Sequence, residues 1–330
     1  MENYLEKHYS VLGAAFSLCS NCPDWMVSMD NFLSITENTR PVESGLKLHL
    51  IEAGADCVDD FICLPHQNCC DENVLLLNMP VPFTVYVEGP RRWNDYVGFG
   101  RSVIDYGSGW AKAVRCRGSG FEAGFSDIVL GYNLLVHLMI RTGFYVIHAS
   151  CVELGGKGIV ITGNSGKGKS TAAYSMARRG HPILADDRLL LVKQGGYRGI
   201  GVTDVVKIRP EAVNLFFPEL HSQIPLYELC GEKYFKASSV DCLNYSGMTK
   251  VEFVFILERT GEPKSRLERI HPSRVVGDLF PVTINPYEHF NMAERFNFLM
   301  DFLHEVKCYR VYFGTDMDYF AGTIEELVGG

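Results

Sequence analysis

At the middle of the chain stands the run Gly163-Asn164-Ser165-Gly166-Lys167-Gly168-Lys169-Ser170-Thr171. It fits the phosphate-binding pattern G-x-x-x-x-G-K-[ST], in which glycines let backbone N–H groups turn toward an anion. The pattern assigns Lys169 to the outer phosphates of a nucleotide and the Ser170 hydroxyl to Mg²⁺. We therefore predict that the whole run, Gly163 to Thr171, forms a nucleotide-binding loop.

The residues on either side of this run favour a strand before it and a helix after it. β-branched residues fill positions 159–162, and residues 170–179 carry alanine and methionine at helical spacing before Gly180, a residue type that commonly ends helices. The helix N-terminus would then face the loop and favour negative charge there. A chance glycine-rich turn is the competing interpretation, and the order of strand, loop and helix disfavours it.

Residues 144–154 predict one further strand, which Gly155-Gly156 joins to the strand leading into the loop. A two-residue glycine turn is typical of a hairpin, so these strands would be antiparallel. This disfavours a doubly wound parallel sheet, whose strands need helical crossovers. Further strands are predicted at 251–258 and 310–313, and helices at 127–142, 287–306 and 316–328. We therefore predict a mixed-sheet α/β domain over residues 126–330.

Residues 1–125 read as a smaller, β-rich accessory domain. Leucines alternate with Lys47 and His49 over 46–50, and a second alternating run covers 83–88. This is the periodicity of strands with one buried face, and glycine-rich turns separate such runs. We expect the helix at 127–142 to open the second domain, which places the boundary near residue 125.

Two adjacent carboxylates, Asp186 and Asp187, follow a predicted strand that starts at Pro182. In phosphate-loop enzymes an acid at a strand end holds Mg²⁺, and a second acid beside it can accept a proton from an attacking hydroxyl. Successive residues of a strand point to opposite faces, so we assign Asp187 to the acceptor hydroxyl and Asp186 to the Mg²⁺ shell. A turn starting at Asp186 would let the two converge, and a simple capping turn is the competing interpretation.

One histidine, His148, lies inside the apolar run 146–150. The hairpin argument places it on the strand that pairs with the strand before the loop. A histidine in that setting is more often a satisfied core residue, so its chemistry alone leaves its role open.

The composition narrows the class of protein. The 330 residues carry a formal net charge of −8, which disfavours a nucleic-acid partner, and no apolar run reaches transmembrane length. The polar, acidic start disfavours a signal peptide, so we expect a cytoplasmic protein without a membrane partner. The 11 cysteines are irregularly spaced, which favours scattered thiols. A zinc site is the alternative, formed from Cys19, Cys22, Cys63, His66, Cys69 and Cys70.

Several runs together carry a family resemblance: His148-Ala149-Ser150-Cys151-Val152, Gly156-Lys157-Gly158, Ile161 to Thr171, Arg179-Gly180-His181 and Leu184-Ala185-Asp186-Asp187-Arg188. They resemble the catalytic domain of HPr kinase/phosphorylase and its relatives. Weaker similarity at 207–213 and 255–259 is to HPr-kinase-like kinases of peptide-modification clusters.

The resemblance implies a P-loop kinase fold of the type shared with ATP-dependent phosphoenolpyruvate carboxykinases. It also implies transfer of the γ-phosphoryl group of ATP to a seryl hydroxyl. By position, Asp187 falls on the family's proton acceptor and His148 on a second catalytic position. Lys169 and Ser170 fall on the phosphate and Mg²⁺ positions. A homo-oligomer is expected as well, since the HPr enzymes are hexamers.

The chain also departs from the bifunctional HPr enzyme. Thr171 stands where that enzyme typically has glutamate, and its signature Glu-Ile-Arg-Gly-x-Gly is at best echoed at 197–202, without the glutamate. We therefore expect a forward kinase, dependent on ATP and Mg²⁺, that acts on a serine of a peptide or protein. One example would be the precursor of a ribosomally made lasso-type peptide.

Two other functions stay open. One is a kinase for the hydroxyl of a small metabolite. The other is a non-catalytic nucleotide-sensing module, which Asp187 and His148 disfavour because a sensor needs no base. Decarboxylating carboxykinase chemistry ranks lower, because the sequence shows no second metal site with lysine and histidine ligands.

Overall fold

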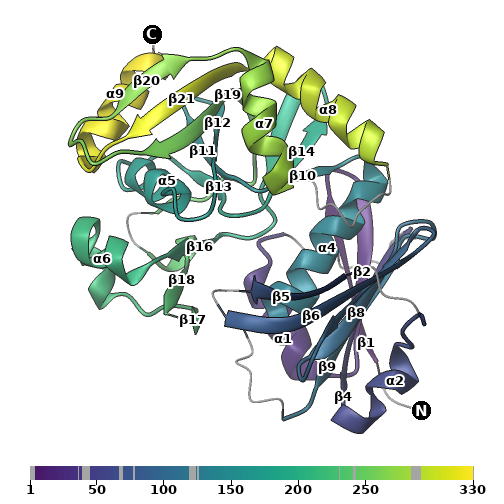
Figure 1. Cartoon of the computed structure of the whole chain (residues 1–330). Helices are drawn as coiled ribbons and strands as arrows, with labels where there is room; N and C mark the ends of the chain where they lie inside the picture. Colours follow the sequence, from purple (N-terminus) through teal and green to yellow (C-terminus); the bar gives the residue numbers. More distant parts are fainter. Residues whose placement is uncertain are drawn as a thin grey trace. The chain divides into compact units, whose positions relative to one another are not determined.

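The computed structural model describes residues 4–35, 37–38, 45–66, 70–76, 79–118, 124, 126–229, 231–240, 243–283 and 291–329. The described residues form two compact units, one up to Phe144 and one from Tyr145 onward (Figure 1). No helix among these residues is long and apolar enough to span a membrane.

The first unit is built on a nine-stranded sheet with the order β3-β1-β2-β4-β9-β8-β7-β6-β5. Its strands are β1 (Leu5–Val11), β2 (Ala14–Ser20), β3 (Glu37–Asn38), β4 (Leu46–Ala53), β5 (Cys70–Leu76), β6 (Met79–Glu88), β7 (Arg91–Tyr96), β8 (Gly100–Asp105) and β9 (Trp110–Cys116). Neighbours are antiparallel except β4, which is parallel to both β2 and β9. Its helices are α1 (Pro23–Phe32), a 3₁₀ turn (Ala55–Cys57), α2 (Val58–Phe61), a π-helical segment (Ser126–Tyr132), α4 (Asn133–Leu138) and a 3₁₀ turn (Met139–Thr142).

The helical segment predicted at 127–142 forms, but it packs within the first unit. Ser28 of α1 donates a hydrogen bond to Asp127, and the rings of Phe32 and Tyr132 lie 5.2 Å apart. The division between the units therefore falls after Phe144, later than the boundary expected near residue 125. The apolar stripe that predicts a helix does not say which unit will cover it.

The second unit contains a mixed sheet with the order β10-β14-β15-β19-β12-β11-β13, and β21 pairs with β19 and β20. Its strands are β10 (Tyr145–Ile147), β11 (Ser150–Leu154), β12 (Lys157–Thr162), β13 (Ile183–Ala185), β14 (Leu189–Lys193), β15 (Tyr197–Ile200), β19 (Met248–Arg259), β20 (Arg266–Arg269) and β21 (Lys307–Phe313). β19 is parallel to β12 and β21, whereas its neighbour β15 is antiparallel. The predicted mixed-sheet α/β class is thus confirmed.

Helices cover both faces of this sheet, with α5 and α9 on one side and α7 and α8 on the other (Figure 1). The helical elements are α5 (Lys169–Ala177), α6 (Pro210–Phe216), 3₁₀ turns (Pro218–Ser222 and Ala237–Ser239), α7 (Pro272–Thr283), α8 (Met292–Glu305) and α9 (Met317–Gly329). Alternate residues of β19 supply the two cores: Phe253 and Phe255 face one, Val254 and Ile256 the other. A small sheet of β16 (Val205–Ile208), β18 (Glu232–Lys236) and β17 (Tyr227–Leu229) adjoins α6 in sequence.

The hairpin before the loop is confirmed. β11 and β12 are antiparallel, and Gly155 and Gly156 turn the chain with φ of 58° and 76°. The single strand predicted over 144–154 is wrong, however, because the chain breaks between Ile147 and Ser150. β10 pairs with β14, whereas β11 pairs with β12 and β13 in another part of the sheet. His148 therefore lies in the break and not on the strand beside β12.

Candidate active site

The loop between β12 and α5 has the conformation that a phosphate-binding loop needs. Gly168 stands before α5 with φ of 99°, and an added Cβ there would lie 2.9 Å from the Phe313 ring. A residue with a side chain would be strained and would also clash, so the turn requires glycine. Lys169, which is 9% exposed, folds back and donates to the Gly163 carbonyl at 2.9 Å. The Lys169 ammonium is thus held over the loop, and no acidic residue in the described part of the chain forms an ion pair with it.

Asp186 lies beneath the loop as a buried hydrogen-bond acceptor. Its Oδ1 accepts from the hydroxyls of Ser150 and Ser170, the latter at 2.9 Å, and its Oδ2 accepts from the Lys207 amide at 2.9 Å. Burial raises the pKa of Asp186, although these donors oppose the change. The strand ends at Ala185, before this residue, so the alternation argument for the two acids does not apply.

Asp187 lies two residues after the end of β13, and its side chain is partly exposed. Its φ is 77°, an unusual value for a residue with a side chain, and its side chain is 40% exposed. Asp187 Oδ1 lies 3.2 Å from His148 Nδ1, and Arg188 Nη1 lies 2.6 Å from that same nitrogen. The turn that starts after β13 thus separates a buried acid from an accessible one.

The contact with Arg188 fixes the protonation of His148. An arginine has donors and no acceptor, so Nδ1 must accept and the ring proton must sit on Nε2. Burial lowers the pKa of His148 to about 4, which agrees with a neutral ring. The 3.2 Å approach of Asp187 to Nδ1 is therefore not a hydrogen bond to an imidazolium, and the positive charge beside Asp187 comes from Arg188.

Neighbouring groups control the charge of Asp187. Burial alone would raise the pKa of this carboxyl, but its neighbours, Arg188 first among them, hold it well below its usual range. Burial lowers the pKa of Lys169. For Lys207 the nearby Asp187 and Glu232 outweigh burial and raise the pKa. Asp187 is consequently ionised at neutral pH.

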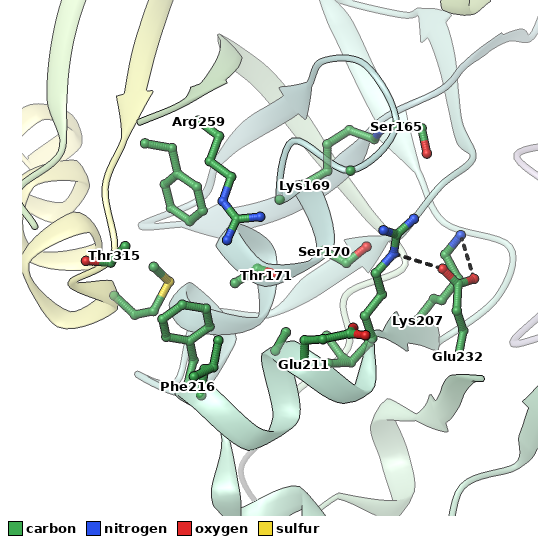
Figure 2. Close-up of a pocket in the computed structure, with 18 of the residues that line it drawn as sticks. Ser165, Lys169, Ser170, Thr171, Lys207, Glu211, Phe216, Glu232, Arg259 and Thr315 are labelled. Atoms are coloured by element: carbon green, nitrogen blue, oxygen red, sulfur yellow. Dashed lines mark hydrogen bonds and ion pairs between the residues drawn. The ribbon is translucent and has the colours of Figure 1, made fainter. Parts of the chain in front are cut away.

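A buried glutamate holds two of the basic residues of the site. Glu232, whose side chain is 4% exposed, lies 3.4 Å from Lys207 Nζ and 3.1 Å from Arg209 Nε. Lys207 and Arg209 come from the end of β16, and Glu232 begins the antiparallel partner strand β18. The small sheet thus positions a fixed group of charges opposite the loop (Figure 2).

These groups line one cavity of about 540 Å³ in the second unit. The lining includes a charged and polar group, which we call the polar end: His148, Asp187, Lys207, Arg209 and Glu232. It also includes an apolar group, which we call the apolar end: Ala212, Phe216, Phe313 and Met317. Figure 2 shows Lys207 and Glu232 on one side of Thr171 and Phe216 on the other. The loop residues Ser165, Gly166, Gly168, Lys169, Ser170 and Thr171 also line the cavity. Lys169, Ser170 and Thr171 lie between Phe216 and Lys207 in the view of Figure 2, and Arg259 reaches toward Thr171 from the end of β19. A ligand held by the loop can therefore extend in both directions.

The donors at the loop fit Mg²⁺. This ion prefers oxygen ligands and is bound through one or two carboxylates together with substrate phosphates. Ser170 Oγ is hydrogen-bonded to Asp186, and Asp187 is the next residue, so hydroxyl and carboxylate oxygens are grouped beside the phosphate loop. A divalent cation here would also offset the cost of burying the Asp186 carboxylate.

Not all of the predicted site residues reach the cavity. Gly163, Asn164 and Lys167 shape the loop without lining it, and Asp186 lies behind Ser170. The echo of the HPr signature at 197–202 falls in and after β15, away from the described lining. For the zinc alternative, Cys69 and the Cys70 side chain lie outside what the structure describes. The described residues contain no cluster of three potential ligands.

Sequence reasoning missed several residues of this cavity. Lys207, Arg209 and Arg259 fall within the two weaker stretches of resemblance, which could have signalled them. Glu232, Phe216 and Phe313 stand in no motif, and only the fold brings them to the loop.

Comparison with known proteins agrees with the geometry. Residues 142–208 match the family model described as HPr Serine kinase C-terminal domain. An HPr kinase/phosphorylase from Mycoplasmopsis pulmonis is 30% identical over 105 residues, covering 27% of this chain and 33% of the relative. Another, from Lactobacillus delbrueckii subsp. bulgaricus, is 35% identical over 112 residues, covering 26% and 35%. The matched segment, residues 142–208, contains the loop, both acids and His148.

The chain spans about a third of the length of these two relatives. Among solved structures, an HPr(Ser) kinase/phosphatase from Coxiella burnetii matches at 14% identity with a TM-score of 0.28. That match covers 56% of this chain and 93% of the other. A score of this size does not establish a common arrangement.

Proposed function

We propose that this chain is an ATP-dependent kinase that transfers the γ-phosphoryl group to a hydroxyl, most specifically a serine hydroxyl of a peptide or protein. The observation that carries the proposal is the accessible, ionised Asp187 in the same cavity as Lys169 and Ser170. A module that only senses nucleotide needs the loop but not an accessible carboxylate beside it. The related HPr kinase/phosphorylases support the reaction class.

The proposed reaction is an in-line transfer. The acceptor oxygen forms a bond to the γ-phosphorus as the bond from that phosphorus to the β–γ bridging oxygen breaks, and ADP leaves. Asp187 accepts the hydroxyl proton, while Lys169 and the loop amides hold the outer phosphates. Ser170 and Asp186 would hold Mg²⁺, which neutralises phosphate charge when bound.

The low pKa of Asp187 suits a site that is completed by its substrate. A carboxylate with so low a pKa is a weak base in the free protein. The negative phosphates of ATP would offset the charges of Lys169 and Lys207, and this would raise the pKa of Asp187 when it is needed. Arg188 keeps His148 neutral and oriented beside the carboxylate, so we assign His148 to positioning within the catalytic group.

Incubation with labelled ATP and with peptides encoded beside the gene tests this function. We expect an added phosphate on a serine, detected by mass. Steady ATP turnover that no acceptor stimulates would contradict a kinase. A ribosomally made lasso-type precursor is one candidate acceptor, and a small hydroxylated metabolite, tested in the same assay, is the alternative. We also propose that the protein works in the cytoplasm and that it self-associates. Light scattering tests the self-association.

The proposed direction is forward only. Thr171 and the absence of a signature glutamate at 197–202 separate this chain from the bifunctional enzyme. Phosphorylated product incubated with inorganic phosphate should release little pyrophosphate, and rapid release would show a phosphorylase.

A further inference from the structure

Two adjacent phenylalanines at the end of α6 have opposite environments. Phe217 is fully buried, and its ring lies 4.4 Å from that of Tyr174 in the core. Phe216 is only partly buried and lines the cavity, as does Leu215, which is 69% exposed. Apolar side chains left open at a cavity commonly mark a ligand surface.

A second apolar surface lies against the loop itself. The Phe313 ring is so close to Gly168 that a Cβ there would meet it at 2.9 Å. Phe313 stacks edge-on with Phe320 of α9 at 4.9 Å, and its carbonyl accepts from the Thr260 amide at 2.9 Å. Met317, which begins α9, is 7% exposed and lines the same end. This wall is therefore held in place before any ligand binds.

The loop fixes the direction in which a nucleotide must lie. Its amides cradle the α- and β-phosphates, while Lys169 reaches the β- and γ-phosphates. The terminal phosphate has to face Asp187 for transfer, so the nucleoside must leave the loop on the other side. Figure 2 shows Phe216 and Thr315 on the side of Thr171 opposite to Lys207 and Glu232.

We propose that the apolar end of the cavity, around Phe216, Phe313 and Met317, is a nucleobase subsite that binds the base of ATP by stacking and apolar contact. This inference rests on the proposed binding of ATP to the loop. Arg259 and Phe313 are paired in register on the adjacent parallel strands β19 and β21. Arg259 makes no ion pair with a described residue. It can therefore contact the α-phosphate or the ribose, which would lie between the loop and the base subsite. None of these four residues lies within the family match at 142–208.

The test separates the base from the phosphates. Binding of Mg·ATP and of inorganic tripolyphosphate is measured by calorimetry for the wild type, Phe216→Ala, and the control Asn214→Ala on the same helix, whose side chain does not line the cavity. Loss of one stacking partner should weaken ATP about five- to 100-fold and leave tripolyphosphate unchanged. Phe216→Trp should restore ATP binding.

Other outcomes overturn the inference in distinguishable ways. If Phe216→Ala weakens the binding of ATP and of tripolyphosphate equally, or leaves the affinity for ATP unchanged, the base subsite is rejected, while the phosphate-binding role of the loop still stands. A Phe216→Ala variant with normal ATP affinity but a raised KM for the acceptor would show that this wall binds the acceptor instead. Failure of the wild type to bind either ligand would overturn the proposed function along with the subsite.

Discussion

The polar and apolar ends of the cavity are built in different ways. At the polar end, His148, Asp187 and Lys207 lie within the family match at 142–208, and Arg209 and Glu232 lie shortly after it. Ion pairs and hydrogen bonds connect these groups. At the apolar end, residues of α6, β21 and α9 line the cavity with apolar side chains. The difference suggests that transfer chemistry depends on a short, charge-balanced segment, whereas the fit of the nucleoside depends on elements far along the chain.

Lys169→Ala should reduce kcat/KM more than any other substitution considered, because Lys169 is proposed to hold the phosphates that lie between the polar and the apolar end of the cavity. Loss of a charge-assisted phosphate contact weakens binding, and loss of transition-state stabilisation slows transfer, so we expect kcat/KM to fall about 10³-fold or more. The control is Lys167→Ala, a loop lysine that does not line the cavity. Similar kinetics for both variants would mean that the loop does not bind the phosphates as described.

Asp187→Asn should affect the polar end alone. Asparagine has nearly the same shape but is no comparable base, so turnover should fall about 10²- to 10⁴-fold while Mg·ATP affinity stays within a few-fold. Single-turnover rates and nucleotide affinity measured in parallel check this. A variant with normal turnover would remove Asp187 from the chemistry.

Asp186→Asn should give a metal defect of intermediate size. The buried carboxylate bonds to Ser170, so its loss should raise the Mg²⁺ concentration for half-maximal rate about 10- to 100-fold. Rates titrated with Mg²⁺, together with melting temperatures, distinguish this from unfolding. If Asp186→Asn slows transfer at saturating Mg²⁺ and Asp187→Asn shows the metal defect, the two roles are exchanged.

The pH dependence should show the smallest effect. In the proposed reaction Asp187 acts as the base in its ionised form, and its lowered pKa keeps that form present as the pH falls. His148 likewise stays neutral above its pKa of about 4. The kcat/KM profile should therefore lose activity on its acid side only below about pH 5. Arg188→Gln removes one of the charges that lower the pKa of Asp187, so the acid limb should move to higher pH. An unchanged limb would mean that another group titrates.

How far the sequence predicts this site depends on how local each feature is. The loop, the Gly155-Gly156 hairpin and the paired acids are local patterns, and the structure places them together. The break at His148 was not predictable, because the apolar run continues through it and only pairing with different strands divides it. The turn after Ala185 was considered only as an alternative, since no glycine marks the positive φ of Asp187.

The remaining residues reach the site through long-range topology. Glu232 comes from the small sheet, and Phe313 from a strand that pairs in parallel with β19. No regular spacing of residues in the sequence indicates such long-range contacts. The helical segment predicted at 127–142 forms, but its unit was assigned wrongly because its amphipathic pattern fits either unit.

The central claim is that one cavity holds ATP with its phosphates on the loop, its γ-phosphate toward Asp187 and its base at the apolar end. A crystal structure of the full chain with Mg²⁺ and a non-hydrolysable ATP analogue tests it most directly. We predict the outer phosphates within hydrogen-bond distance of Lys169 Nζ, and the base in contact with Phe216 and Met317. A nucleotide bound in the reverse direction, with its base beside Glu232, or bound outside this cavity, would contradict the account.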